Sequence, residues 1–128
     1  MVNLEELCKN ACEVKNQIGM LGCDSKNRVL MSAADMLLKQ EKEILEANAI
    51  DVENGKKNQM PEGLLDRLTL NHDRIQSMAD GLKQVAALDD PIGEVLSMKK
   101  RPNGLIIGKR RVPIGVIGII FEARPNVT

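Results

Sequence analysis

The sequence of 128 residues predicts an α/β fold that this chain leaves incomplete. Three observations predict it. Over residues 1–93, apolar side chains follow helical spacing between helix-capping residues. Two short apolar and basic runs then flank Asn103-Gly104, the strongest short signal for a β-hairpin. Finally, residues 112–121 are almost continuously apolar, which is typical of a central strand in a parallel sheet covered on both faces.

The first helix is predicted to begin after Asn3, a favoured N-cap residue, with Glu6 placed to complete a capping box. Val2 and Leu7 stand where a hydrophobic staple requires apolar residues. Apolar residues then recur at helical spacing until Gly19, where we expect the helix to end.

Ser25 is the expected N-cap of a second helix, whose apolar stripe continues to Val52. Polar residues 39–43 interrupt this stripe, so the segment is either one bent helix or two abutting ones. Gly55 and the polar run 56–58 are expected to end it.

Pro61 suits the first position of a short helix that extends through Leu68. Asn71 is the expected N-cap of a further helix with Asp73 in its first turn, where a negative charge suits the helix dipole. The apolar stripe of that helix comprises Ile75, Met78, Ala79, Leu82, Val85 and Ala86. His72 has no acidic or metal-ligating partner close in sequence apart from Asp73, and we interpret it as a surface residue.

Residues 94–100 and 105–111 are predicted to form the two hairpin strands, because both Asn103 and Gly104 tolerate a positive φ. The hairpin is strongly basic, which suits either an exposed ribbon protected by its charges or a nucleic-acid surface. We favour the exposed ribbon. The chain carries 18 basic and 18 acidic residues, and Phe121 is its only aromatic side chain, so neither a positive field nor stacking platforms are present.

A buried parallel strand at residues 112–121 needs neighbouring strands, and the sequence contains no second strand of this kind. The chain is therefore either a fragment or completes its sheet with another polypeptide. The loop that follows Phe121 would lie at the carboxyl end of the strand, where open α/β sheets bind ligands.

The three cysteines are too few and too irregularly spaced for a disulfide framework. Cys8 and Cys12 share a helix face, and we interpret them as small apolar residues rather than metal ligands. Cys23 has no basic neighbour that would activate it. The sequence shows no targeting signal and no membrane-spanning stretch, so we expect a cytoplasmic protein without a metal site.

Specific motifs cluster near the end of the chain. They are Arg101-Pro102-Asn103-Gly104-Leu105, Arg111-Val112-Pro113-Ile114-Gly115-Val116-Ile117-Gly118 and Phe121-Glu122-Ala123-Arg124-Pro125-Asn126-Val127-Thr128. With Leu65-Asp66-Arg67-Leu68 and Arg74-Ile75 upstream, they closely resemble the N-terminal part of γ-glutamyl phosphate reductase. That family, also called glutamate-5-semialdehyde dehydrogenase, is part of the aldehyde dehydrogenase superfamily.

The resemblance implies an aldehyde dehydrogenase-like fold that is incomplete in this chain. Residues 1–93 would be the helical part of the N-terminal cofactor-binding domain, and residues 94–111 the β-hairpin of the oligomerisation region. Residues 112–128 would be the first buried strand and the loop of the cofactor-binding domain. A homo-oligomer formed through the hairpin is the implied assembly.

The implied reaction is the NADPH-dependent reduction of γ-glutamyl phosphate to glutamate 5-semialdehyde in proline synthesis. The nucleophilic cysteine of the family lies downstream of the matched part, so we expect no catalytic nucleophile and no activity in this chain alone. The resemblance makes Phe121, Glu122, Ala123 and Arg124 candidates for cofactor or substrate binding, because Arg124 suits a phosphate or carboxylate. Asn126 is a candidate oxyanion donor. A plain turn at residues 124–126 is the alternative.

Two other functions stay open at this point. The chain could be part of a reductase of the same superfamily that acts on another acyl phosphate or aldehyde. It could also be a non-catalytic short chain that serves as a structural or regulatory partner of full-length subunits. The apolar segment 112–121 is the feature that would allow such pairing.

Overall fold

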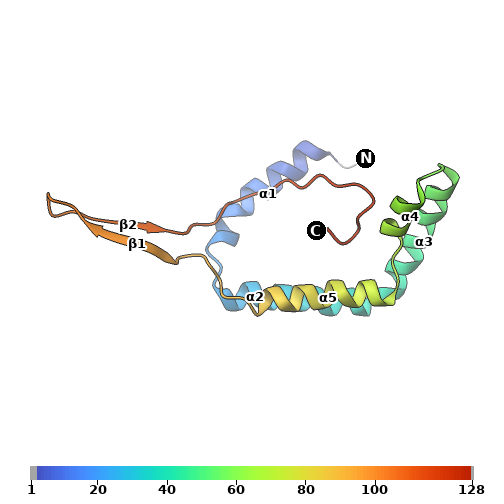
Figure 1. The fold of residues 1–128 in the computed structure, drawn as a ribbon, viewed down its shortest axis with the longest axis horizontal. Coiled ribbons are helices and arrows are strands. Elements are labelled where there is room, and N and C mark those ends of the chain that lie inside the picture. Colours follow the sequence, from blue (N-terminus) through green and yellow to red (C-terminus); the bar gives the residue numbers. More distant parts are fainter. Residues whose placement is uncertain (1–2, 128) are drawn as a thin grey trace. The chain divides into compact units, whose positions relative to one another are not determined.

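The computed structural model describes residues 3–127, so Val2 of the expected staple and Thr128 lie outside the described residues. The described chain contains five α-helices followed by a two-stranded hairpin (Figure 1). It divides into two compact units. The first comprises the N-terminal residues to Cys23 and Asp89–Gly118, and the second comprises Asp24–Leu88 and the residues from Ile119 onward. This division differs from the three expected segments, whose roles in a complete enzyme stay a prediction.

In the first unit, helix α1 spans Leu4–Gly19, as the sequence predicts. The side chain of Asn3 caps it, because its Oδ1 accepts hydrogen bonds from the backbone N–H groups of Glu5 at 3.1 Å and Glu6 at 3.5 Å. The helix packs closely against the segment that follows the hairpin. A Cβ placed on Gly19 would lie 3.2 Å from Cγ of Pro113.

The hairpin pairs β1 (Val95–Lys100) with β2 (Ile106–Arg110) in antiparallel register, and every residue of both strands is exposed. Its turn differs in one respect from the prediction. Only Gly104 has a positive φ, of 87°, whereas Asn103 does not. The N–H of Gly104 donates to the carbonyl of Arg101 at 2.9 Å, which places Pro102 at the second position of a β-turn. Proline fixes φ near −65° at that position, so Pro102 selects a turn in which Gly104 alone is left-handed.

Residues 112–121 do not form the expected buried strand. They lie outside any strand and all are exposed, with Ile120 at 101% of its reference exposure. A strand requires a neighbour that accepts and donates its backbone hydrogen bonds, and no partner for this segment exists among residues 3–127. The apolar pattern is therefore present without the sheet that would bury it.

In the second unit, the long helical stretch is two helices and not one. Helix α2 spans Cys23–Lys39 and α3 spans Glu41–Lys57, with Gln40 between them. Ser25 is not the N-cap, because α2 already begins at Cys23; its hydroxyl instead accepts a hydrogen bond from Nη2 of Arg28 at 3.2 Å. Helix α3 ends within the predicted polar run 56–58, at Lys57 with Asn58 as its C-cap, and not at Gly55. Gly55 is a buried residue of the helix, where a Cβ would lie 3.0 Å from Cδ1 of Leu65.

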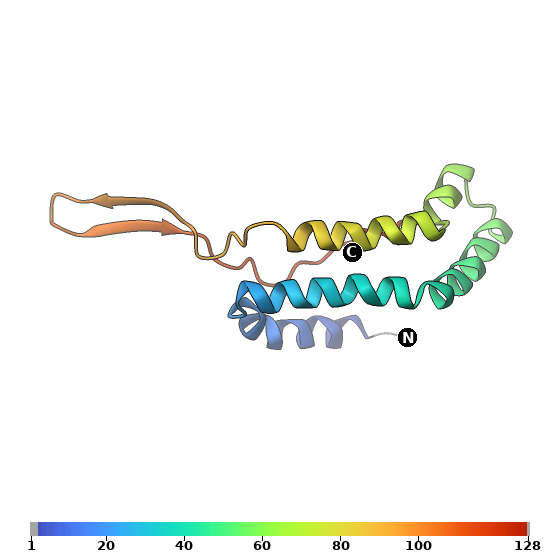
Figure 2. The ribbon, with the colours of Figure 1, turned by 90° about the horizontal axis from the view of Figure 1, so that it is seen from below.

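Helix α4 (Glu62–Leu68) packs against α3, and α5 (His72–Ala86) returns antiparallel alongside α2 (Figure 2). Pro61 occupies the N-cap of α4 rather than its first turn. The small core consists of Ala34 on α2 and of Ile75 and Ala79 on α5, all fully buried. None of the described helices is both long and apolar enough to cross a membrane.

Candidate functional site

A groove of about 970 Å³ lies within the second unit. Its walls come from α2, α4, α5 and the last described turn of the chain. The apolar lining consists of Ala33, Met36, Leu37, Leu70, Met78, Leu82, Val85, Pro125 and Val127. The predicted stripe of α5 thus contributes to this groove as well as to the small core, because helical spacing turns its apolar residues to one side.

The C-terminal wall of the groove is a β-turn over residues 124–127. The N–H of Val127 donates to the carbonyl of Arg124 at 3.2 Å, and Pro125 occupies the second position of the turn. Ala123, just before it, has a left-handed φ of 47°. This conformation costs a non-glycine residue about 1 kcal/mol, so the surroundings of the turn must hold it.

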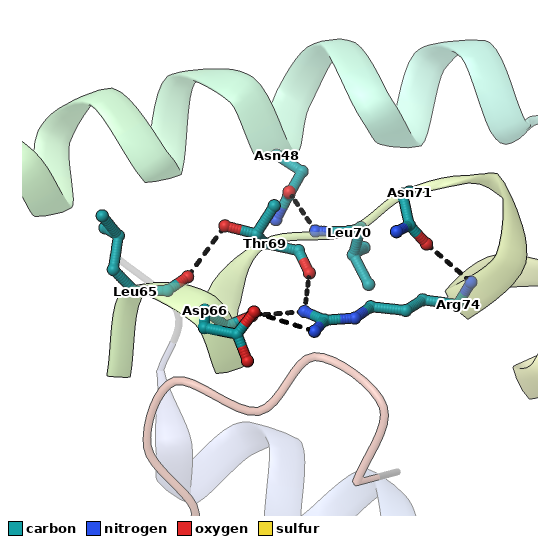
Figure 3. Close-up of polar contacts among 7 residues, drawn as sticks. All are labelled: Asn48, Leu65, Asp66, Thr69, Leu70, Asn71 and Arg74. Carbon is teal, nitrogen blue, oxygen red and sulfur yellow. Dashed lines mark hydrogen bonds and ion pairs between the residues drawn. The ribbon is translucent and has the colours of Figure 1, made fainter. Parts of the chain in front are cut away.

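The side chain of Arg74 links α5 to the end of α4 (Figure 3). Its Nη1 donates to the carbonyls of Thr69, at 2.5 Å, and Asp66, and its Nη2 pairs with Oδ1 of Asp66 at 3.0 Å. A guanidinium presents several donors in one plane, so one side chain satisfies carbonyls at the end of α4 together with a carboxylate. The backbone N–H of Arg74 in turn donates at 2.8 Å to Asn71, the predicted N-cap of α5.

Asn48 ties the same junction to α3. Its Nδ2 donates to the carbonyl of Leu68 at 2.8 Å. Its Oδ1 accepts from the N–H of Leu70 at 2.7 Å (Figure 3). The side chain is 7% exposed and is the one buried polar side chain of the described core. An amide matches both a carbonyl and an N–H at once, which explains why a polar residue is stable here.

His72 forms a further link between helices of this unit. Its Nδ1 lies 2.9 Å from Oε1 of Glu41, which joins the start of α5 to the start of α3. The hydrogen bond to Glu41 raises the pKa of His72 above its usual 6.5. The negative charge of Glu41 adds to this rise, desolvation opposes it, and Asp73 adds a smaller increase. His72 is exposed, as expected, but it has an acidic partner that is distant in sequence.

No family model matches the chain. It is similar over all 128 residues to the γ-glutamyl phosphate reductases of Agathobacter rectalis, at 63% identity, and Lachnospira eligens, at 48%. Solved structures agree. The γ-glutamyl phosphate reductase of Thermotoga maritima matches 98% of this chain with 43% identity and a TM-score of 0.92, and that of Saccharomyces cerevisiae matches 99% with 33% identity and a TM-score of 0.90.

The chain is similar to an N-terminal portion of γ-glutamyl phosphate reductase. It spans 31% of the length of each of the two bacterial relatives, and it covers 30% and 32% of the two solved chains. The similarity extends along the whole of this chain, so it includes both compact units and the turn at residues 124–127.

Of the five residues for which the reductase resemblance predicts a binding role, two line the groove and three do not. Arg124 and Asn126 line the groove, whereas Phe121, Glu122 and Ala123 do not. The turn proposed as the alternative at residues 124–126 is present, and its side chains also contribute to the groove. Sequence reasoning did not predict that Asp66, Arg67 and Arg74 would lie on the same groove. The only signal was their presence in the family-like motifs, which carries no information about distance.

The cysteines offer no alternative centre. Cys8, Cys12 and Cys23 are all exposed. Neither Cys8 nor Cys12 has a hydrogen-bond partner within residues 3–127, so no described base is placed to activate either thiol. Within that same range, no group of three His, Cys, Asp or Glu side chains is arranged to hold a metal ion.

Proposed function

We propose that this chain forms part of an enzyme that reduces γ-glutamyl phosphate to glutamate 5-semialdehyde in proline biosynthesis. The similarity to γ-glutamyl phosphate reductases over all 128 residues, at identities up to 63%, carries this proposal. Because the chain spans about a third of those relatives, the activity is proposed for the whole protein. The fold supports the assignment, since the two solved reductases match nearly all of this chain.

The chemistry requires a nucleophile that attacks an acyl phosphate and later leaves. A cysteine thiolate would attack the γ-carbonyl, break the bond to the phosphate oxygen and release inorganic phosphate, leaving a thioester. The thioester would accept a hydride, which NADPH supplies, and the resulting thiohemiacetal would collapse to the aldehyde and regenerate the thiolate. None of the three cysteines here is placed for this role, so the family's downstream cysteine would perform it.

The groove residues would bind and orient ligands in that reaction. Arg124 is exposed on the groove wall without a hydrogen bond or ion pair from its guanidinium to residues 3–127, so it is available for a phosphate or carboxylate. Asn126 would donate its amide to the developing oxyanion. Phe121, Glu122 and Ala123 would complete the cofactor or substrate contacts on the segment that leads to the groove. A nicotinamide cofactor, specifically NADPH, is part of this proposal.

The hairpin would mediate homo-oligomerisation of the complete enzyme. Both of its strands are exposed and pair only with each other among the described residues. Exposed apolar side chains such as Met98 and Ile106 would be covered in that assembly. The enzyme would be cytoplasmic, with a small-molecule substrate and no nucleic-acid or membrane partner.

Two measurements test the proposal. The first is the mass of the native gene product in source cells, detected with an antibody against residues 1–128. The second is NADPH oxidation with γ-glutamyl phosphate, assayed both with that native product and with the purified 128-residue chain. We expect a product several times heavier than 14.1 kDa that oxidises NADPH, and no oxidation by the purified chain. Oxidation by the chain alone would contradict the assignment of the nucleophile to a downstream cysteine.

One observation favours a second function. Residues 112–121 expose an apolar segment that could pair with a partner strand from another chain. A native product of 14.1 kDa that co-purifies with longer reductase subunits would support a structural or regulatory partner instead of a catalytic subunit. A heavier native product would exclude this role.

A further inference from the structure

The chain contains two Asn-Gly pairs, and the fold places them in different surroundings. Asn103-Gly104 lies at the tip of the hairpin between β1 and β2 (Figure 1), whereas Asn54-Gly55 lies in the last turn of α3. Both asparagine side chains are exposed. Asparagine followed by glycine is the pair most prone to deamidation, because glycine has no side chain to hinder attack by its backbone nitrogen on the asparagine amide.

We propose that Asn103 is a site of spontaneous deamidation and isomerisation, and that its helix protects Asn54 from the same reaction. The backbone nitrogen of Gly104 attacks Cγ of Asn103 and loses its proton to hydroxide. The bond from Cγ to Nδ2 then breaks, and Nδ2 takes up a proton from water and leaves as ammonia. The product is a succinimide ring. Water opens this ring at either of its two carbonyls, so position 103 becomes aspartate or isoaspartate.

A hydrogen bond within the turn activates the amide of Asn103. The backbone N–H of Leu105 donates to Oδ1 of Asn103 at 3.2 Å. Negative charge develops on this oxygen when the nitrogen of Gly104 adds to Cγ, so a donor is already directed at the atom that becomes an oxyanion. Preorganised donors of this kind lower the barrier for addition to a carbonyl group. Asn54 has no side-chain hydrogen bond to residues 3–127.

Few contacts hold Gly104, the source of the attacking nitrogen. Its N–H donates to the carbonyl of Arg101 at 2.9 Å, and this bond must break before the nitrogen attacks. A Cβ at Gly104 would meet no atom within 4 Å, and its φ of 87° is one that glycine adopts without strain. The bonds that shape the turn lie within residues 101–105, so they depend on no other part of the protein. Opening the turn therefore disrupts only its own bonds.

Gly55, by contrast, is held from several sides. In an α-helix each N–H donates to the carbonyl four residues earlier, so the nitrogen of Gly55 is already engaged. The carbonyl of Gly55 accepts from the N–H of Met60 at 3.0 Å, and that of Asn54 accepts from Asn58 at 3.0 Å. Gly55 is also buried, and a Cβ there would lie 3.0 Å from Cδ1 of Leu65. Attack by this nitrogen requires local unfolding of the end of α3 and loss of its packing on α4.

Conversion at position 103 changes the hairpin in two ways. Isoaspartate inserts a methylene into the main chain, which lengthens a turn whose closing bond joins the N–H of Arg101 to the carbonyl of Leu105 at 2.7 Å. It also adds a negative charge beside Arg101. The strand pair nearest the turn, Lys100 with Ile106, should therefore loosen, and the NMR signals of these two residues should change. The far end of the ladder should stay paired.

The first experiment incubates the full 128-residue chain in mildly alkaline buffer and follows each Asn-Gly peptide by mass spectrometry. Deamidation raises the peptide mass, and a protein isoaspartyl methyltransferase labels the isoaspartate product. We expect Asn103 to convert about tenfold faster than Asn54 or more, which corresponds to a barrier lower by about 1.4 kcal/mol or more. In urea that unfolds the chain, both sites should convert at similar rates, because hairpin and helix are lost. Absence of a preference for Asn103 in the folded chain, or conversion of Asn103 only in urea, would overturn the proposal.

Asn103→Gln and Asn54→Gln form a matched pair of variants. Glutamine keeps the amide without charge, but attack on it forms a larger ring and is much slower. Asn103→Gln should remove most of the isoaspartate label and of the released ammonia, whereas Asn54→Gln should leave both unchanged. Equal losses in the two variants would contradict the proposal. The wild-type peptides report on the two sites separately, so the test stays valid if either variant unfolds.

The same peptide analysis applied to the native gene product tests the site in the whole protein. Purified native product should convert at Asn103 and stay intact at Asn54. An Asn103 that remains intact there under the same conditions would overturn the proposal. The reaction needs no substrate, cofactor or cysteine, so its outcome is independent of the reductase assay.

Discussion

Replacing Asn48 with alanine is expected to destabilise the second unit by about 1.5–5.5 kcal/mol. The variant removes the acceptor of the Leu70 N–H and the donor to the Leu68 carbonyl, bonds of 2.7 and 2.8 Å. Each half-buried backbone group left without a partner costs about 1–3 kcal/mol. Alanine returns about 0.5 kcal/mol through its higher helix propensity, which does not offset the loss.

Urea denaturation of the chain, followed by circular dichroism, measures this change through the midpoint at constant slope. Asn54→Ala is the matched control. Asn54 is exposed on the same helix, so the variant gains the same helix propensity and loses no described hydrogen bond. Asn48→Asp should also destabilise, because a carboxylate cannot donate to the Leu68 carbonyl. A loss below about 0.5 kcal/mol relative to Asn54→Ala would refute the view that Asn48 holds α3 to the α4–α5 junction.

Three other changes test separate features of the chain. Gly81→Ala should stabilise α5 by about 0.5–1 kcal/mol in urea denaturation, whereas Gly55→Ala should gain less or lose, because its Cβ would meet Leu65 at 3.0 Å; equal gains would contradict the close packing of Gly55. The raised pKa of His72 stabilises the folded chain fully below pH 6.5, and this contribution is lost as the pH rises through the raised pKa. His72→Gln should therefore lower the unfolding midpoint in urea at a pH below the raised pKa and leave it unchanged at a pH above it. An equal effect below and above the raised pKa would be inconsistent with a protonated pair. We expect the exposed apolar segment 112–121 to make the chain self-associate, and Ile120→Lys should reduce this association, measured by light scattering. The variant should not lower stability, because Ile120 is 101% exposed. Unchanged scattering would argue against self-association through residues 112–121.

Local signals predicted most elements of this chain, because each depends on neighbours a few residues away. The caps at Asn3 and Asn71 and the hairpin around Gly104 follow from side chains and backbone angles within one turn. The errors have different causes. At Asn103 the cause is local, because the preceding proline selected a different turn. At Gly55 and at residues 112–121 it is tertiary, because Gly55 packs against Leu65 of another helix and residues 112–121 have no neighbouring strand among the described residues.

The sequence by itself determined where most helices and both hairpin strands form, since capping, spacing and turn chemistry are local properties. Only the tertiary structure decided which of these residues meet. The pairs Asn48 with Leu70, and His72 with Glu41, are 22 and 31 residues apart. Arg67 and Arg124 share a groove because α2, α4, α5 and the last turn pack into one unit. Such contacts arise from packing many side chains at once, and no periodicity in the sequence encodes them.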